Sequence, residues 1–148
     1  MSNFVLWFVK ITGWIPNLLY LRRKTYYLKN NKKIKKRKEA AVIISNHTSL
    51  MDFPLYMYTF MGSTVRPLVA EITYNKNSFM RTLLKLIGGI KVDRDSYDFS
   101  FMGECINALD KKNSVLIFPE GRLPKKNETE LLSFKPSFVY IALESNTP

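Results

Sequence analysis

One histidine in this chain is followed five positions later by an aspartate, a pairing that can move a proton near neutral pH. His47 and Asp52 lie in the stretch SNHTSLMDFP, directly after the apolar run AAVII. On one continuous helix, five residues would separate the two side chains by about 140° around the axis. They can meet only if His47 lies in the turn before a helix whose first turn holds Asp52. The carboxylate would then accept the Nδ1 proton and leave Nε2 as a general base.

The same two residues also have an ordinary interpretation. His47 could fill a turn, and Asp52 could be the N-cap of the helix that follows. A lone His-x4-Asp spacing has no specificity of its own, so the rest of the chain must decide between the two interpretations.

Strands and helices alternate along the sequence after residue 39. Strands are predicted at 40–45, 64–70, 90–94 and 114–119, and helices at 52–61, 77–87, 96–112 and 137–146. Pro67 marks the second strand as an edge or irregular strand, Ser78 is the candidate cap of the second helix, and Gly88-Gly89 ends that helix. The alternation predicts an α/β fold with a largely parallel or mixed sheet flanked by helices.

Polar and charged residues gather where three of the predicted strands run into loops, in SNHTSLMD, VDRDS and FPEGR. Ligand sites in open α/β sheets lie outside the carboxyl ends of the strands. Arg94, Glu120 and the histidine all fall at such ends, which indicates an active site. As an alternative, Arg94 could pair with the neighbouring aspartates at the surface, and Glu120-Gly121 could be an ordinary turn.

Charge divides the chain into an arm, residues 1–38, and a domain, residues 39–148. The arm holds eleven Lys and Arg and no acidic residue, so the net charge of +11 belongs to it. Its apolar, aromatic half adjoins its polybasic half, and these two signals favour a membrane-docking arm of one or two short interfacial helices. The expected membrane-binding residues are Trp7, Trp14, Lys32, Lys33, Lys35 and Lys36. The alternative is a solubilising lysine run beside an ordinary core helix.

Several other classes of protein are disfavoured. The arm does not have the order of a signal peptide, and Lys10 and Pro16 interrupt the apolar stretch that a membrane-spanning helix needs. The single cysteine, Cys105, excludes a cysteine-rich zinc site and is expected to be a small buried hydrophobe. Nucleic-acid-binding domains more often spread basic residues over a folded surface, so no nucleic-acid partner is expected. A non-catalytic membrane- or nucleic-acid-binding module using the basic arm stays open as an alternative.

Three blocks in this order, NHTSLMD, GGIKVDRDS and IFPEGRLPKKNETELLSFKPS, resemble the glycerolipid acyltransferase family, particularly its bacterial 1-acylglycerol-3-phosphate acyltransferases. The resemblance begins near residue 40 and continues to the end of the chain; the arm resembles that family's membrane-docking helices more loosely. It implies that His47 is the catalytic base of an HX4D motif and that Asp52 orients it. The residues that it implies for binding the substrate are Arg94, Glu120, Gly121, Arg122 and Lys135.

The sequence departs from the family pattern in three places. Many members read Glu-Gly-Thr-Arg where this chain reads Glu-Gly-Arg-Leu, so Arg122 comes one residue early. Ser137 stands where many have the glycine of Phe-Lys-x-Gly. The family also continues into a fourth block beyond the position of Pro148, so the domain at 39–148 is expected to be truncated at its C-terminus.

The resemblance implies transfer of a fatty acyl group from acyl-CoA or acyl-carrier protein to lysophosphatidic acid, making phosphatidic acid in phospholipid biosynthesis. Another lysophospholipid or glycerol-phosphate acceptor is the nearest alternative. A thioester is an activated donor, so a positioned imidazole suffices as base, and no metal or other cofactor is expected. Membrane phospholipids are the expected partners, at the cytoplasmic face of the cell membrane, with the protein peripheral or monotopic.

Overall fold

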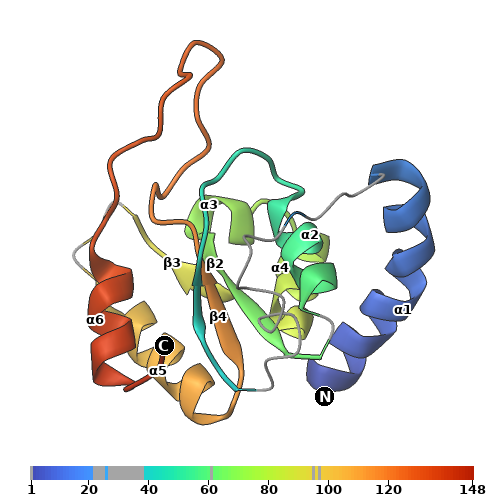
Figure 1. The fold of residues 1–148 in the computed structure, drawn as a ribbon, viewed down its shortest axis with the longest axis horizontal. Coiled ribbons are helices and arrows are strands. Elements are labelled where there is room, and N and C mark those ends of the chain that lie inside the picture. Colours follow the sequence, from blue (N-terminus) through green and yellow to red (C-terminus); the bar gives the residue numbers. More distant parts are fainter. Residues whose placement is uncertain (1, 22–25, 27–38, 61, 95, 97) are drawn as a thin grey trace.

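A parallel sheet lies at the centre of the computed structural model, which describes residues 2–21, 26, 39–60, 62–94, 96 and 98–148 (Figure 1). Within these residues the strand order is β1-β4-β2-β3, and every neighbouring pair is parallel. The strands are β1 (Val42–Ile44), β2 (Val65–Ala70), β3 (Ile90–Val92) and β4 (Ser114–Ile117). The helices are α1 (Ser2–Leu21), α2 (Asp52–Thr59), α3 (Glu71–Tyr74), α4 (Ser78–Ile87), α5 (Ser100–Asp110) and α6 (Ser137–Glu144). The predicted α/β fold is confirmed.

Helices cover both faces of the sheet. On one face α5 and α6 pack together against β1, β3 and β4. On the other face α2 and α3 pack against β2, α4 packs against α3, and α1 packs against α2 and α4 (Figure 1). Leu68 contacts the apolar cluster on the α5–α6 side, and its neighbour Val69 contacts the cluster on the α2–α4 side. Successive strand residues point to opposite faces, so the sheet separates two apolar layers. All of β4 is buried between them.

Pro67 predicted an edge or irregular strand, and the edge alternative is wrong, because β2 lies inside the sheet. Val65, Arg66 and Pro67 pair with β4, and the pairing with β3 begins only at Leu68. The missing amide of proline therefore falls where β2 passes from one partner strand to the other, at a position that costs the sheet little pairing.

Helix α4 begins and ends at residues that favour helix ends, but the predicted N-cap, Ser78, is wrong. Its N-cap is Asn77, whose side-chain oxygen accepts a hydrogen bond from the amide of Met80 at 2.7 Å, and not Ser78. Asparagine caps as well as serine does, and here it comes one residue earlier. Gly88 ends the helix as predicted, in the left-handed conformation with φ of 73°, which glycine adopts without steric cost.

The described part of the arm, residues 2–21, forms one continuous helix, α1, which runs through Gly13 and Pro16 and packs against α2 and α4. Lys10, on the face towards the domain, is buried, and its Nζ donates to the carbonyls of Ser63 at 2.7 Å and Phe60 at 3.3 Å. Burial lowers the pKa of Lys10 below its ordinary value. These carbonyls follow α2, where the helix dipole favours a cation. The lysine therefore joins the arm to the helix that begins with Asp52.

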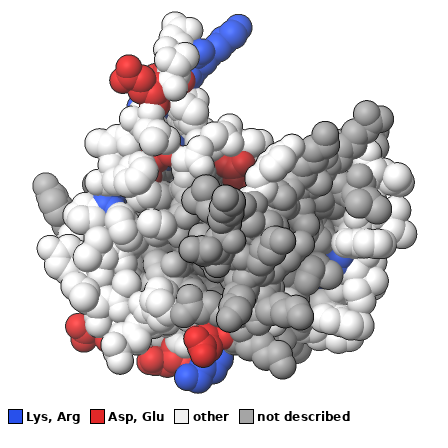
Figure 2. All heavy atoms as spheres, viewed as in Figure 1, with Lys and Arg blue, Asp and Glu red and all other residues white. Residues whose placement is uncertain are grey.

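The outward face of α1 carries large apolar side chains, among them Phe4, Trp7, Phe8, Ile11, Trp14, Ile15 and Leu19. Over α1, at the right of Figure 2, the described surface is almost free of charged side chains. None of the described helices combines the length and the apolar character needed to cross a membrane. The expected lysines at 32, 33, 35 and 36 lie outside the described residues.

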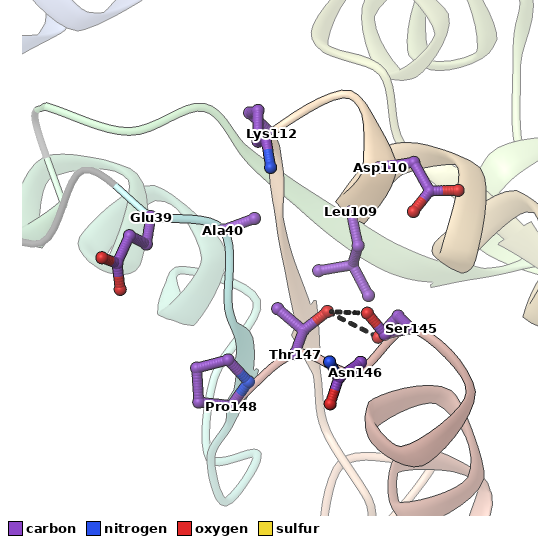
Figure 3. Close-up of a pocket in the computed structure, with 9 residues that line it drawn as sticks. All are labelled: Glu39, Ala40, Leu109, Asp110, Lys112, Ser145, Asn146, Thr147 and Pro148. Atoms are coloured by element: carbon purple, nitrogen blue, oxygen red, sulfur yellow. Dashed lines mark hydrogen bonds between the residues drawn. The ribbon is translucent and has the colours of Figure 1, made fainter.

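A hollow of about 410 Å³ lies beside the amino-terminal ends of β1 and β4, between Glu39, Lys112 and the C-terminal residues (Figure 3). Next to it the amide of Val42 donates to the carbonyl of Pro148 at 2.9 Å, so the last residue pairs with the free edge of β1. His47 follows the other end of β1. The hollow is therefore remote from the residues that the sequence selects.

Candidate active site

The three polar junctions lie at one edge of the sheet. His47 follows β1 by three residues, Arg94 follows β3 by two, and Phe118 directly follows β4. Because all the strands are parallel, these junctions share the carboxyl edge. The helix after β1 lies on one face and the helix after β4 on the other, so the chain diverges between these neighbouring strands. Such a divergence opens the crevice in which α/β proteins bind ligands.

His47 and Asp52 meet in the way that their spacing allows. His47 lies in the loop before α2, Asp52 is the first residue of α2, and Nδ1 is 3.0 Å from Oδ2. The same carboxylate accepts the amides of Thr48 at 2.7 Å and Ser49 at 2.9 Å. Asp52 is therefore not a simple N-cap of α2, whose N-cap is Met51. It organises the turn that carries the imidazole.

The carboxyl group of Asp52 is buried, yet it is held in its charged form. Burial disfavours the carboxylate, but the hydrogen bonds from the two amides and from His47 outweigh it, so the pKa of Asp52 lies below its ordinary value. A charged acceptor at Nδ1 fixes the tautomer with the proton on Nδ1. Among the described residues Nε2 has no hydrogen-bond partner, and the side chain of His47 keeps 19% of its exposure. The geometry leaves Nε2 without a protein partner among the described residues, on a side chain that is partly exposed.

Phe118 and Glu120, which both follow β4, also hold His47 in place. The ring of Phe118 stacks on the imidazole, with centroids 4.1 Å apart and planes 17° from parallel. Oε1 of buried Glu120 accepts the backbone amide of His47 at 3.0 Å, and Oε2 accepts the amide of Leu132 at 3.4 Å. The imidazole is thus held at one nitrogen, at one ring face and at its main chain.

Two cationic side chains converge on Gly121, next to Glu120. Nη1 of Arg94 donates to the carbonyl of Gly121, so the guanidinium reaches across the end of β2 from the far strand. The side chain of Lys135 lies over the α-carbon of the same glycine, where an added Cβ would be 3.5 Å from Cε and 3.8 Å from Nζ. Gly121 has φ of 71°, which any other residue would adopt with strain. This arrangement concentrates positive charge next to Glu120, whose carboxylate accepts the backbone amide of His47.

Arg122 has a different partner from Arg94 and Lys135. Its guanidinium forms two hydrogen bonds to the carboxylate of Glu128, at 2.6 and 2.8 Å, and Glu128 also accepts the amide of Lys125 at 2.7 Å. The pair lies within the long loop that rises above the sheet between β4 and α6 (Figure 1). The guanidinium of Arg122 therefore stabilises its own loop by pairing with Glu128, whereas the side chains of Arg94 and Lys135 lie at Gly121.

Tyr56 is a residue of the site that the sequence analysis missed. Its hydroxyl donates to Oγ of Ser45, and its ring packs edge-on against Phe118, with centroids 6.4 Å apart. Tyr56 comes four residues after Asp52 on α2, so the two side chains share one helix face. That spacing is the signal that could have found it.

No group of three or more acidic, cysteine or histidine side chains within the described ranges could hold a metal ion. Cys105 is fully buried, and burial raises the pKa of its thiol to about 12, which makes it a poor nucleophile. The polar groups that the structure places at this edge include the imidazole of His47, the carboxylate of Asp52 and the cations at Gly121.

Known proteins with similar sequences are 1-acyl-sn-glycerol-3-phosphate acyltransferases. The coconut palm (Cocos nucifera) enzyme is 35% identical over 111 residues, 73% of this chain and 35% of its own length. The Borreliella burgdorferi enzyme is 29% identical over 108 residues, 72% of this chain and 42% of its own length. The chain thus spans well under half the length of these curated relatives.

A solved structure has the same fold. The 1-acyl-sn-glycerophosphate (LPA) acyltransferase PlsC from Thermotoga maritima superimposes with a TM-score of 0.59 at 18% identity, covering all of this chain and 73% of that one. Residues 26–148 match the sequence profile of the acyltransferase family, which includes every junction described above. From the match over most of its length, this chain belongs to the acyltransferase family.

Proposed function

We propose that this protein transfers a fatty acyl group from an acyl thioester to the free hydroxyl of 1-acylglycerol-3-phosphate, forming phosphatidic acid. The observation that carries the proposal is the 3.0 Å contact between Nδ1 of His47 and Asp52, with Nε2 accessible at the carboxyl edge of the sheet. The similar proteins from coconut palm and Borreliella burgdorferi are named for this activity.

The chemistry follows from the state of the imidazole. Nε2 removes the proton of the acceptor hydroxyl as its oxygen attacks the thioester carbonyl. The tetrahedral intermediate then collapses and the carbon–sulfur bond breaks. The departing thiolate takes from the imidazolium the proton that came from the acceptor hydroxyl. Asp52 stabilises the imidazolium, and its lowered pKa keeps it charged throughout. The donor, acyl-CoA or acyl-carrier protein, is already activated, so we expect no metal or other cofactor.

The acceptor phosphate is assigned to Arg94 and Lys135. Both side chains lie at Gly121, whose neighbour Glu120 contacts His47, so a phosphate bound there would hold the attached glycerol near Nε2. Holding a reactant beside a catalytic group lowers the barrier by removing the entropy cost of bringing them together. We leave Arg122 out of this assignment because its guanidinium donates two hydrogen bonds to Glu128.

The arm would hold the protein at the lipid surface that contains both substrates. The exposed apolar face of α1, with Trp7 and Trp14, suits burial in the interface, and the polybasic residues 22–38 suit anionic lipid. We assign the protein to the cytoplasmic face of the cell membrane, as a peripheral or monotopic protein.

Acyl transfer to lysophosphatidic acid in mixed micelles tests the proposal, with acyl-CoA and acyl-carrier-protein donors compared in parallel. Wild type is expected to form phosphatidic acid, and His47→Ala to lose about 10²- to 10⁴-fold in rate, the range for a missing general base. Lysophosphatidylcholine and glycerol 3-phosphate as acceptors separate the substrate class. A His47→Ala protein that binds vesicles of phosphatidylglycerol yet transfers at the wild-type rate would contradict the proposal.

A further inference from the structure

The carboxylate of Glu120 joins two segments that are far apart in the sequence. One oxygen accepts the amide of His47, 73 positions earlier, and the other accepts the amide of Leu132, 12 positions later. Glu120 is 7% exposed, so both bonds lie away from bulk water. A buried carboxylate needs such partners, since leaving it unpaired would be strongly destabilising.

We infer that Glu120 is a positioning residue for His47, which acts through the backbone amide and does not contact the acceptor. Each oxygen accepts a main-chain amide and the side chain is only 7% exposed, so the carboxylate is enclosed by the protein's own main chain. The inference deepens the proposed function and rests on it, because it concerns the same imidazole.

The hydrogen bond from the amide of His47 to Glu120 fixes the position of the His47 main chain, which Asp52 and Phe118 do not fix. Asp52 orients the ring about its nitrogen and Phe118 restrains the ring plane, but neither sets where the α-carbon of His47 lies relative to β4. The loop between β1 and α2 has no strand pairing after Ser45, whose amide donates to the carbonyl of Ile117. Glu120 supplies the next connection between this loop and the end of β4. Its loss would let the base drift from the position in which proton transfer is fast.

The same residue links the imidazole to the phosphate-binding side chains. Gly121 follows Glu120 directly, and its carbonyl accepts Arg94 while Lys135 lies over its α-carbon. The residue that holds the main chain of His47 and the glycine that both cations reach are therefore neighbours in the chain. A positioning residue here would affect turnover, whereas a phosphate ligand would affect acceptor affinity.

Kinetics of Glu120→Gln separate these two roles. The variant is isosteric, but an amide accepts at only one of its two atoms, so one of the two main-chain bonds is lost and the other loses its charge. We expect kcat to fall about tenfold or more while KM for lysophosphatidic acid changes by less than about twofold. Glu130→Gln, an exposed glutamate of the same loop, is the matched control and is expected to keep wild-type kinetics. An increase in acceptor KM with unchanged kcat would overturn the inference in favour of direct substrate binding.

A second measurement detects the hydrogen bond between the amide of His47 and Glu120 by NMR, without an activity assay. The chain has one histidine, so protein labelled with 15N at histidine amides gives a single backbone signal. We expect its proton to move upfield in Glu120→Gln and further in Glu120→Ala, with Glu130→Gln unchanged. An unmoved signal in folded Glu120→Gln would overturn the inference even if wild type is active. If wild type transfers no acyl group, the proposed function fails while this signal still reports whether the bond exists.

Discussion

Nδ1 of His47 lies 3.0 Å from Oδ2 of Asp52, although the two residues would point to different sides of one helix. They meet because α2 begins at Asp52 and His47 stays in the preceding loop. The carboxylate also collects the amides of Thr48 and Ser49, so one side chain both builds the turn and orients the ring. The local fold and the proposed chemistry therefore depend on the same atoms.

Replacing Arg94 tests the phosphate assignment. Arg94→Ala removes a cation that reaches Gly121 from across the sheet, and hydrogen bonds to charged groups contribute about 1.5–3 kcal/mol. We expect KM for lysophosphatidic acid to rise about tenfold or more with kcat less affected. Monoacylglycerol, which lacks the phosphate, serves as the control acceptor. If the variant slows transfer to both acceptors equally, Arg94 does not bind the phosphate.

The stacked ring of Phe118 is expected to matter for turnover. Phe118→Leu keeps an apolar side chain but loses the flat surface 4.1 Å from the imidazole. Aromatic pairs contribute about 0.5–1.5 kcal/mol, which corresponds to a loss in kcat of about two- to tenfold. Phe138→Leu, in α6 on the other face, is the control that changes core packing alone. Equal kcat values in the two variants would show that the stacking has no catalytic effect.

The pH dependence of stability should reflect the pair of Glu128 with Arg122. Hydrogen bonds from Arg122 and from the amide of Lys125 lower the pKa of Glu128 from 4.5 to about 2. A carboxyl group with a lowered folded pKa stabilises the protein above its unfolded value, and this contribution is lost as the pH falls through the folded value. Glu128→Gln should thus be less stable than wild type near neutrality, with the difference shrinking below pH 4.5. Urea unfolding at several pH values measures it, and a difference independent of pH contradicts the ion pair.

The contact between α1 and α2 gives a prediction about stability. A Cβ at Gly13 would lie 1.8 Å from the hydroxyl of Tyr58 and 3.1 Å from its Cζ, so Gly13→Ala must displace the ring or the helix. We expect the free energy of unfolding to fall by about 1–3 kcal/mol, the usual cost of overpacking. Tyr58→Phe in the same chain removes the nearest atom and should recover part of the loss. No recovery in the double variant would place the strain elsewhere.

Much of the fold could be predicted because its signals are local. Alternating strands and helices, and the Gly88-Gly89 stop, are written in consecutive residues, and parallel strands bring their exits to one edge. Helix geometry gave the condition under which His47 and Asp52 can meet, and the structure fulfils it. The roles of the site residues remain predictions for the experiments above.

Features that depend on partners distant in the sequence could not be predicted. Pro67 indicates an edge strand by itself, but strand order is decided by packing on both faces. Arg122 acquires Glu128 only when the loop folds back, and Glu120 acquires the amide of His47 only when β1 and β4 pair. Local sequence patterns single out these residues, but they do not show which residues will contact them in the fold.

The central claim is that His47 and Asp52 act as one unit in acyl transfer, and a double-mutant cycle tests it most directly. Phosphatidic acid formation is measured for wild type, His47→Gln, Asp52→Asn and the double variant, each confirmed as folded. Asp52 acts through the imidazole, so we predict that Asp52→Asn alone slows transfer by about 10²-fold or more and slows the His47→Gln enzyme hardly further. Independent, multiplicative losses, or a His47→Gln enzyme at the wild-type rate, would contradict the account.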